Sequence, residues 1–179
     1  MKYVALLRGV NVGGNRKVGM QRLKALFERM GMAAVQTYIN SGNVIFGSNG
    51  AEAGDLVAQL ESAIQREFGF PVMVLVRSAE NLQAVADALP DSWVDGSEAK
   101  CDVMFLRDEI DGEDALNQLT IKPDIDDVRY VPGAILWRAD RAKLTRSGMM
   151  KLAGTELYAN MTVRNCNTVR NLAARTCTD

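Results

Sequence analysis

Three short segments rich in asparagine and glycine hold the residue types best suited to binding chemistry. They are Leu7–Asn15, Tyr38–Asn43 and Thr162–Thr168. Asparagine offers uncharged hydrogen-bond donors and acceptors, and glycine lets the backbone adopt conformations that other residues avoid. The first and third segments also contain an arginine, which bonds well to phosphate and carboxylate groups. The three segments therefore predict a site for a polar or anionic ligand.

The candidate ligand-binding residues all lie in these segments or directly after the first one. They are Arg8, Asn11, Gly13, Gly14, Asn15, Arg16, Lys17, Asn40, Ser41, Arg164, Asn165 and Asn167. The arginines and the lysine would supply positive charge, and the asparagines would supply direction. No acid–base pair stands out among them, so the sequence assigns no catalytic residue.

The first segment follows a predicted strand and precedes a predicted helix, where backbone amides can receive an anion. It contains neither the GxxxxGK[ST] pattern of a P-loop nor the GxGxxG pattern of a dinucleotide site, which argues against a P-loop NTPase. The alternative is that its glycines only permit a tight strand-to-helix connection. A turn rarely needs Arg8, Arg16 and Lys17 as well, so we expect this loop to bind.

The other two segments also have structural interpretations. Residues 40–43 have the composition of a tight turn between two strands, and we favour this structural role over ligand binding. In the third segment, Asn165 or Asn167 can cap the final helix, and Arg164 with the remaining first-turn amides could receive a carboxylate or phosphate, which we favour over capping plus an internal salt bridge. Cys166 is either a reactive thiolate at that helix end or, as we favour, a small semi-buried filler.

Composition excludes several kinds of chemistry. The chain of 179 residues contains no histidine, which excludes Ser-His-Asp and Cys-His catalysis and histidine-ligated metals. The three cysteines are odd in number and never spaced as CxxC, which argues against a disulfide framework and a cysteine zinc site. We therefore expect no metal and no cofactor. The apolar runs are strand-sized and no leader precedes the first strand, so we expect a cytoplasmic protein with no membrane partner.

Charge is unevenly distributed along the chain, although the net charge is only −1. Residues 1–40 carry seven basic and one acidic side chain, a net of +6. Residues 41–140 carry seven basic and nineteen acidic side chains, a net of −12, and residues 141–179 carry seven and two, a net of +5. This asymmetry suggests an anionic partner, or equally an internal neutralisation between the ends and the middle of the chain.

Hydrophobic periodicity predicts that residues 3–76 form a βαββαβ unit. A strand over 3–7, a helix over 20–30, a hairpin over 35–46, a helix over 55–68 capped by Asp55 and a strand over 72–76 follow in that order. This is the ferredoxin-like order, an antiparallel sheet with both helices on one face. The first strand is apolar on both sides, so we expect it in the interior of the sheet.

The second half repeats a similar order less clearly. We predict a strand over 101–106, a short helix over 113–119, a hairpin over 128–138 around Pro132-Gly133, and broken helical structure beyond Arg141 that ends in a helix over 165–174. The fold class is therefore α+β. We expect two lobes, a ferredoxin-like lobe over 1–77 and a second, related α+β lobe over 78–179 that contains the C-terminal helices and packs on the first.

Three motifs in this order resemble one known family. LLRGVNVGGNRKV, TYINSGNVIF and TVRNCNT are similar to the corresponding motifs of the bacterial family called domain of unknown function 1697. The resemblance implies a cytoplasmic α+β protein built from ferredoxin-like halves, and it implies no particular activity. That family commonly has tryptophan where this chain has Cys166, so a reaction that depends on this thiol would not be a family property.

Three hypotheses for function follow. The first is binding of a phosphate-bearing ligand, either a nucleotide metabolite or nucleic acid, through the loops rich in Gly, Asn and Arg. The second is a histidine-free enzyme that acts on a phosphorylated or carboxylated small molecule bound by the same residues. The third is a protein-interaction module in which the three segments are purely structural. The sequence does not predict an oligomeric state.

Overall fold

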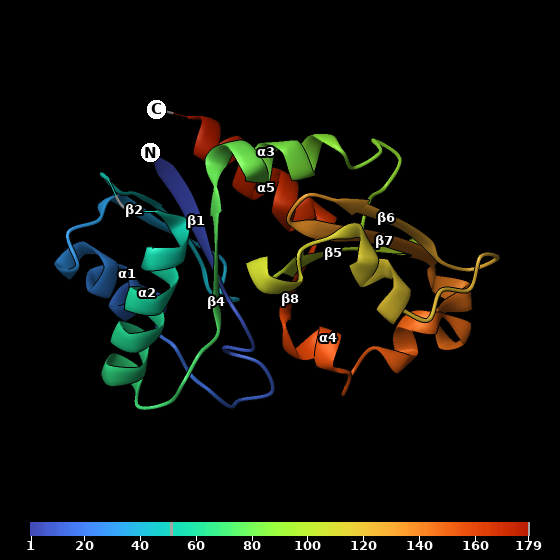
Figure 1. Ribbon diagram of the computed structural model, residues 1–179, viewed down its shortest axis with the longest axis horizontal. Helices are drawn as coiled ribbons and strands as arrows, with labels where there is room; N and C mark the ends of the chain where they lie inside the picture. Colours follow the sequence, from blue (N-terminus) through green and yellow to red (C-terminus); the bar gives the residue numbers. More distant parts are fainter. Residues whose placement is uncertain (51, 179) are drawn as a thin grey trace. The chain divides into compact units, whose positions relative to one another are not determined.

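The computed structural model describes residues 1–50 and 52–178. The chain divides into two compact units: unit 1 comprises Met1–Leu82 and Leu172–Asp179, and unit 2 comprises Gln83–Asn171. Each unit contains one four-stranded antiparallel sheet (Figure 1). The predicted α+β class is confirmed. The proposed boundary at residue 77 remains a prediction about independently folding domains.

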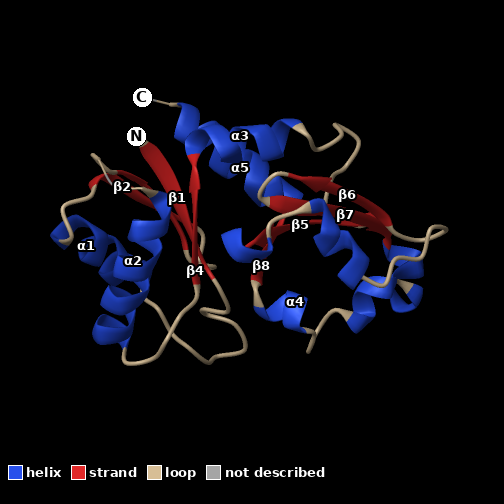
Figure 2. Ribbon diagram, in the orientation of Figure 1, coloured by secondary structure: helices blue, strands red, loops and turns tan. Residues whose placement is uncertain are grey.

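Unit 1 has the predicted ferredoxin-like topology. Its strands are β1 (Lys2–Leu7), β2 (Ala33–Tyr38), β3 (Asn43–Gly47) and β4 (Val74–Ser78), in the sheet order β2-β3-β1-β4. Helices α1 (Met20–Arg29) and α2 (Ala53–Phe68) lie on one face of this sheet (Figure 2). Strand β1 is interior, as predicted, and Leu6 and Leu7, which point to opposite faces, are both fully buried. The core comes from the apolar stripes of both helices, with Phe27 and Ile64 fully buried against the sheet.

Unit 2 repeats this strand order with different covering elements. Its strands are β5 (Ala99–Leu106), β6 (Asp127–Val131), β7 (Ala134–Asp140) and β8 (Met161–Asn165), in the order β6-β7-β5-β8. The connections contain the 3-10 helices η1 (Asp108–Ile110), η2 (Glu113–Gln118), η3 (Arg141–Arg146) and η4 (Gly148–Lys151), and one short α-helix, α4 (Glu156–Ala159). The short helix predicted over 113–119 is present as the 3-10 helix η2, which has six residues.

The two sheets end in the same local motif. Strand β4 leads through Arg77 and Ser78 into α3 (Ala79–Asp87), and β8 leads through Arg164 and Asn165 into α5 (Cys166–Cys177). Ser78 Oγ accepts a hydrogen bond from the Asn81 amide at 3.1 Å, which caps α3. Each arginine pairs with a valine of the central strand, Arg77 with Val4 and Arg164 with Val103. The repeat thus extends from strand order to individual residue positions.

Two predicted boundaries in unit 1 are wrong. Helix α2 begins at Ala53, so Asp55 lies in its first turn and does not cap it; the acid there still complements the helix dipole. Strand β4 begins at Val74, not at residue 72, and the Val74 amide donates to Glu61 Oε1 at 2.9 Å. The longest described helix is α2 with 16 residues, and no described helix is both long and apolar enough to cross a membrane.

Gly42 is expected to be far less replaceable than Gly14, although both have positive φ angles. A Cβ atom on Gly42 would lie 2.7 Å from Leu7 Cβ and 2.8 Å from Val10 Cγ2, at φ +78°. Gly42→Ala should therefore combine about 1–2 kcal/mol of left-handed strain with about 1–3 kcal/mol of overpacking. Gly14 has φ +77° and no atom within 4 Å, so Gly14→Ala should carry only the first term. Urea denaturation followed by circular dichroism measures both, and equal losses would contradict the packing argument.

Candidate functional site

The first Asn/Gly segment forms a small exposed hairpin after β1. The Asn15 amide donates to the Val12 carbonyl at 3.2 Å, and the Asn11 amide donates to the Arg16 carbonyl at 3.1 Å. Gly13 and Gly14 form its tip with φ angles of +61° and +77°. Both are exposed, as are Asn15, Arg16 and Lys17. The glycines therefore serve a turn that projects its backbone into solvent.

Asn11 holds the base of this hairpin and joins it to the second segment. Its Nδ2 donates to the carbonyls of Val18, at 2.9 Å, and of Asn40, at 2.7 Å. Its Oδ1 accepts the Val18 amide at 2.8 Å. Asn11 also has φ +57°, a conformation that asparagine tolerates better than most residues. These bonds give the Asn11 side chain a structural role.

The second segment forms the loop between β2 and β3, as predicted. Asn40 is exposed, and its carbonyl is the acceptor for Asn11. Ser41 Oγ accepts a hydrogen bond from Asn43 Nδ2 at 2.9 Å, and the same nitrogen donates to the Tyr38 carbonyl at 3.0 Å. Asn43 is fully buried. Asn43 belongs to the turn predicted over 40–43, and its side chain closes that turn.

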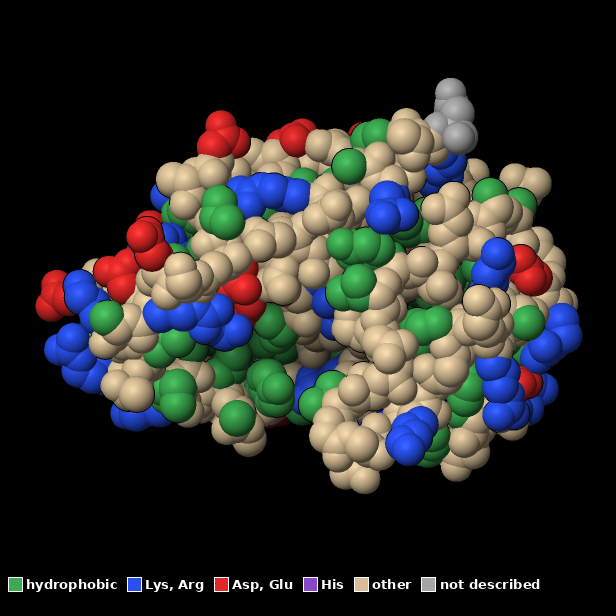
Figure 3. Space-filling model, turned by 180° about the vertical axis from the view of Figure 1, so that it is seen from behind, with side chains coloured by type: hydrophobic (Ala, Val, Ile, Leu, Met, Phe, Trp, Pro, Cys, Tyr) green, Lys and Arg blue, Asp and Glu red, His purple; other side chains and the backbone are tan. Residues whose placement is uncertain are grey.

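Three loops, over residues 8–19, 39–42 and 69–73, meet at one end of the sheet of unit 1. The Leu7 amide donates to the Gly42 carbonyl at 2.8 Å, and the Arg8 amide donates to the Met73 carbonyl at 2.9 Å. These loops contain Arg8, Arg16 and Lys17 and no aspartate or glutamate. Figure 3 shows basic side chains on the part of the surface that unit 1 forms, and also on the part that unit 2 forms.

Helix α1 begins at this same end of the sheet, directly after the first loop. Its N-cap is Gly19, which provides no side-chain hydrogen bond, and its first turn contains no acidic residue. The positive end of the helix dipole is therefore not compensated by the helix itself. The basic loops and the helix terminus together make this end of unit 1 electropositive.

Arg164 occupies a buried position in unit 2, with 7% of its surface exposed. Its Nη1 donates to Thr162 Oγ1 and to the Val163 carbonyl, both at 2.9 Å. Burial lowers the pKa of Arg164 to about 10. Arg77, at the same register position in unit 1, is also buried and donates to the Val76 carbonyl at 3.0 Å. A buried arginine at the same place in both sheets supports a structural role for each.

The two asparagines of the third segment bond to the protein. Asn165 Oδ1 accepts the Thr168 amide at 2.8 Å, so Asn165 is the residue that caps α5. Asn167 Nδ2 donates to the Asp95 carbonyl at 2.8 Å, and Asn167 Oδ1 accepts the Asp95 amide at 3.2 Å. Asn167 thus fixes the segment before β5 against the start of α5.

Cys166 is fully buried, not semi-buried as predicted. Its Sγ donates to the Trp93 carbonyl at 3.2 Å. Cys101, which is also fully buried, lies beside it, and burial together with Cys166 raises the pKa of the Cys101 thiol to about 12. This surrounding favours a packed thiol over a reactive thiolate.

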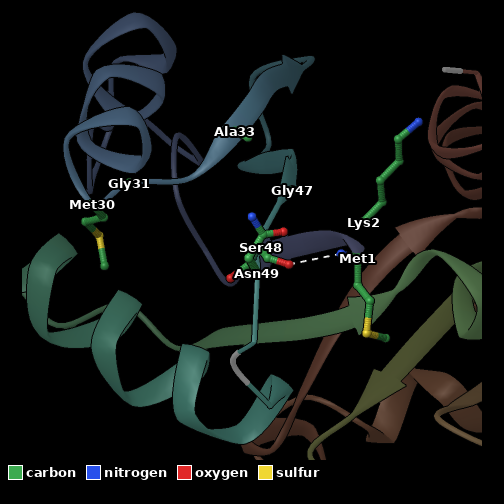
Figure 4. A pocket seen from close by; sticks show the side chains of 8 residues that line it. All are labelled: Met1, Lys2, Met30, Gly31, Ala33, Gly47, Ser48 and Asn49. Carbon is green, nitrogen blue, oxygen red and sulfur yellow. Dashed lines mark hydrogen bonds between the residues drawn. The ribbon is translucent and has the colours of Figure 1, made fainter.

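A separate hollow lies at the opposite end of the sheet of unit 1, where β1 begins and α1 ends. It has a volume of about 410 Å³ and is lined by Met1, Lys2, Met30, Gly31, Ala33, Gly47, Ser48 and Asn49 (Figure 4). The Met1 amino group donates to the Ser48 carbonyl at 3.0 Å. None of the predicted ligand-binding residues lines this hollow.

Asp126 is a buried polar residue that the sequence reasoning missed. It accepts hydrogen bonds from Trp137 Nε1 (3.0 Å), the Gly148 amide (2.9 Å), the Lys122 amide (3.0 Å) and the Ser147 hydroxyl. Burial by itself raises the pKa of Asp126, but the four donors together hold it below the usual value. Asp126 thereby joins the loop before β6 to β7 and to η4. Its neighbours Asp124 and Asp127 are exposed, so no local pattern marks it.

The two-unit α+β fold agrees with the family that the three sequence motifs indicated. The chain belongs to the family described as "Protein of unknown function (DUF1697)", which it matches over residues 1–137. Its structure is similar to that of the conserved bacterial protein SP0830 from Streptococcus pneumoniae, with 27% sequence identity, 98% of each chain covered and a TM-score of 0.84. No curated protein matches the sequence. The predicted family resemblance is confirmed, and the structural similarity extends through the third segment.

Proposed function

We propose that this protein binds a phosphate-bearing ligand, a nucleotide or nucleic acid, at the electropositive end of unit 1. One observation carries the proposal: the three loops there contain three cations and no carboxylate, beside a helix N-terminus without a capping side chain. Anions bind well to such a combination of unbonded amides and positive charge. We also propose the cytoplasmic location predicted from the sequence, because nucleotides and nucleic acids are abundant in the cytoplasm.

The hairpin can contribute backbone donors as well as charge. Among residues 1–50 and 52–178, no acceptor is bonded to the amides of Gly13 or Gly14. The guanidinium of Arg16 lies 6.0 Å from the centre of the Phe70 ring, which helps to hold it near the hairpin. The nearby acid Glu67 is already neutralised by Arg22, at 2.6 Å, and Arg29, at 2.8 Å. It therefore does not offset the charge of the loops.

The candidate residues would have different roles at this site. Direct contact falls to Arg8, Arg16, Lys17 and the backbone of Gly13, Gly14 and Asn15. Asn11, Asn40 and Ser41 would hold the loops in place, since the first two are bonded to each other across the two segments. Arg164, Asn165 and Asn167 would support unit 2. No reaction is assigned to the site, because it presents no acid–base pair.

Two double variants of equal charge test the proposal. Arg16→Ala/Lys17→Ala should weaken ligand binding by about tenfold or more, since each charged hydrogen bond to phosphate contributes roughly 1.5–3 kcal/mol. Lys24→Ala/Arg66→Ala removes the same charge from a half-buried position on α1 and an exposed position on α2, and should change affinity less than about threefold. Fluorescence anisotropy with a labelled single-stranded oligonucleotide, competed with ATP, separates nucleic acid from nucleotide. Absence of binding by the parent protein at low salt, or equal weakening in both double variants, would refute the site.

A further inference from the structure

Unit 2 contains a cavity of about 330 Å³ over the face of its sheet that the 3-10 helices cover. Met104, Trp137 and Val163, from β5, β7 and β8, form its floor, and Met149 and Tyr158 contribute to its walls. Met104 and Trp137 are almost completely buried. The lining is mainly apolar, and its charged members are Lys100 and Asp102 of β5.

The cavity has a physical cause in the way the repeated fold is covered. In unit 1, helices of 10 and 16 residues place continuous apolar stripes over the sheet. In unit 2, the elements on the corresponding face are 3-10 helices of three to six residues and an α-helix of four. Such short pieces cannot present a continuous stripe. The sheet of unit 2 is therefore incompletely covered.

The strand registers identify equivalent positions in the two units and show how unit 2 differs from unit 1 at the floor of the cavity. In unit 1, Tyr3 pairs with Phe46 of β3 and with Ser78 of β4. In unit 2, the residue in the same relation is Asp102, which pairs with Trp137 of β7 and with Asn165 of β8. The Tyr3 and Phe46 rings stack with centroids 5.8 Å apart, whereas unit 2 sets a carboxylate opposite an indole.

A carboxylate at this position costs free energy unless something compensates it. Asp102 is 7% exposed, and burial raises its pKa despite the nearby Lys100 ammonium. Lys100 Nζ lies 3.1 Å from Asp102 Oδ2, and the Lys100 side chain is 38% exposed. Within the described part of the chain, no side chain or amide is bonded to the other oxygen, Oδ1. The cavity thus holds a carboxylate able to accept a further hydrogen bond.

We propose that this cavity binds a small aromatic amine, whose ammonium group pairs with Asp102 and whose ring lies against Trp137 and Met104. Charge complementarity favours a cation, because Asp102 is the more buried of the two charged lining residues, with 10% of its side chain exposed against 38% for Lys100. The Trp137 indole is held by its bond to Asp126 and offers an aromatic surface, while methionines adapt readily to a ring. The volume lies at the lower end of ligand cavities, about 300–1,000 Å³, which suits a small molecule. This site is independent of the proposed phosphate site.

Methyl NMR of protein labelled at the methionine methyl groups tests the proposal directly. Titration with phenethylamine should give saturable shifts at Met104, Met149 and Met150, which line the cavity, and none at Met20 or Met30 in unit 1. Phenethyl alcohol and phenylpropionate match the probe in its ring but lack the positive charge, and should bind at least about tenfold more weakly. The absence of shifts with millimolar phenethylamine, or equal binding of the alcohol, would overturn it.

Asp102→Asn provides the matching variant. It should weaken phenethylamine binding by at least about tenfold and leave the melting temperature unchanged or raised, because it removes a buried charge whose partner, Lys100, is partly exposed to water. Asp114→Asn, at an exposed position of η2, should change neither quantity. Undiminished binding by Asp102→Asn would overturn the assignment. A negative result for phenethylamine would not affect the interpretation of the oligonucleotide titrations, because those test the phosphate site of unit 1.

Discussion

Replacing Gly148 by alanine is expected to lower the free energy of unfolding by more than about 4 kcal/mol, or to prevent unit 2 from folding. A Cβ atom on Gly148 would lie 1.8 Å from the Thr120 carbonyl oxygen, 2.6 Å from the Thr120 carbonyl carbon and 3.2 Å from Asp126 Oδ2. Two of these atoms belong to the backbone, which cannot move aside as a flexible side chain can. Any shift of Gly148 would also disturb its amide bond to Asp126, at 2.9 Å.

Thermal and urea denaturation followed by circular dichroism would measure this loss. Gly112→Ala is the matched control, since Gly112 lies in the same unit, has φ −174° and has no atom within 4 Å of the position that a Cβ atom would take. Its stability should change by less than about 1 kcal/mol. A Gly148→Ala variant as stable as the control would show that the segments carrying Thr120 and Gly148 can separate without cost.

Asp126→Asn is expected to lower the free energy of unfolding by about 2–4 kcal/mol at pH 7. Four donors converge on the two carboxylate oxygens, from Trp137, Ser147, Gly148 and Lys122. An asparagine in this place keeps one acceptor oxygen and turns an amide group toward donors, which leaves buried polar groups unsatisfied. Asp124→Asn, at an exposed position two residues away, should have little effect. Equal stabilities of the two variants would contradict this account.

The effect of Asp126 should also depend on pH in a defined direction. Its pKa is lowered in the folded protein, so the carboxylate contributes stability above the unfolded value of about 3.9. That contribution is lost as the pH falls through the folded pKa. The stability difference between the parent and Asp126→Asn should therefore shrink below about pH 4, as measured by urea denaturation across roughly pH 3–7. A difference that stays constant over this range would exclude the ionised carboxylate as its source.

The topology of unit 1 could be predicted because its signals are local. Apolar residues on both sides of β1 indicated an interior strand, and the apolar spacing of residues 20–30 and 55–68 indicated two helices. Both predictions are confirmed by the sheet order and the buried stripes. The covering elements of unit 2 were harder to predict. Over 113–118 and 141–151 the chain forms 3-10 helices, and helical composition by itself does not distinguish these from α-helices.

The three Asn/Gly segments located positions of unusual chemistry, but composition could not say what each side chain bonds to. An asparagine can cap a helix, close a turn or meet a ligand with the same two groups. The structure shows Asn165 capping α5, Asn43 closing a turn, and Asn11 joining two loops that are 29 residues apart in sequence. Such partners come from distant parts of the chain, so no local pattern reveals them.

The sequence by itself determined the α+β class, the strand order of unit 1 and the family, because periodicity, turn residues and motif spacing are properties of contiguous residues. Only the tertiary structure decided that Arg164 is buried, that Asp126 collects four donors and that Asp102 pairs with Trp137 beside a cavity. Asp124 and Asp126 are the same residue type, two positions apart in one loop. Asp126 is buried and accepts hydrogen bonds from β7 and η4, which lie further along the chain, whereas Asp124 is exposed.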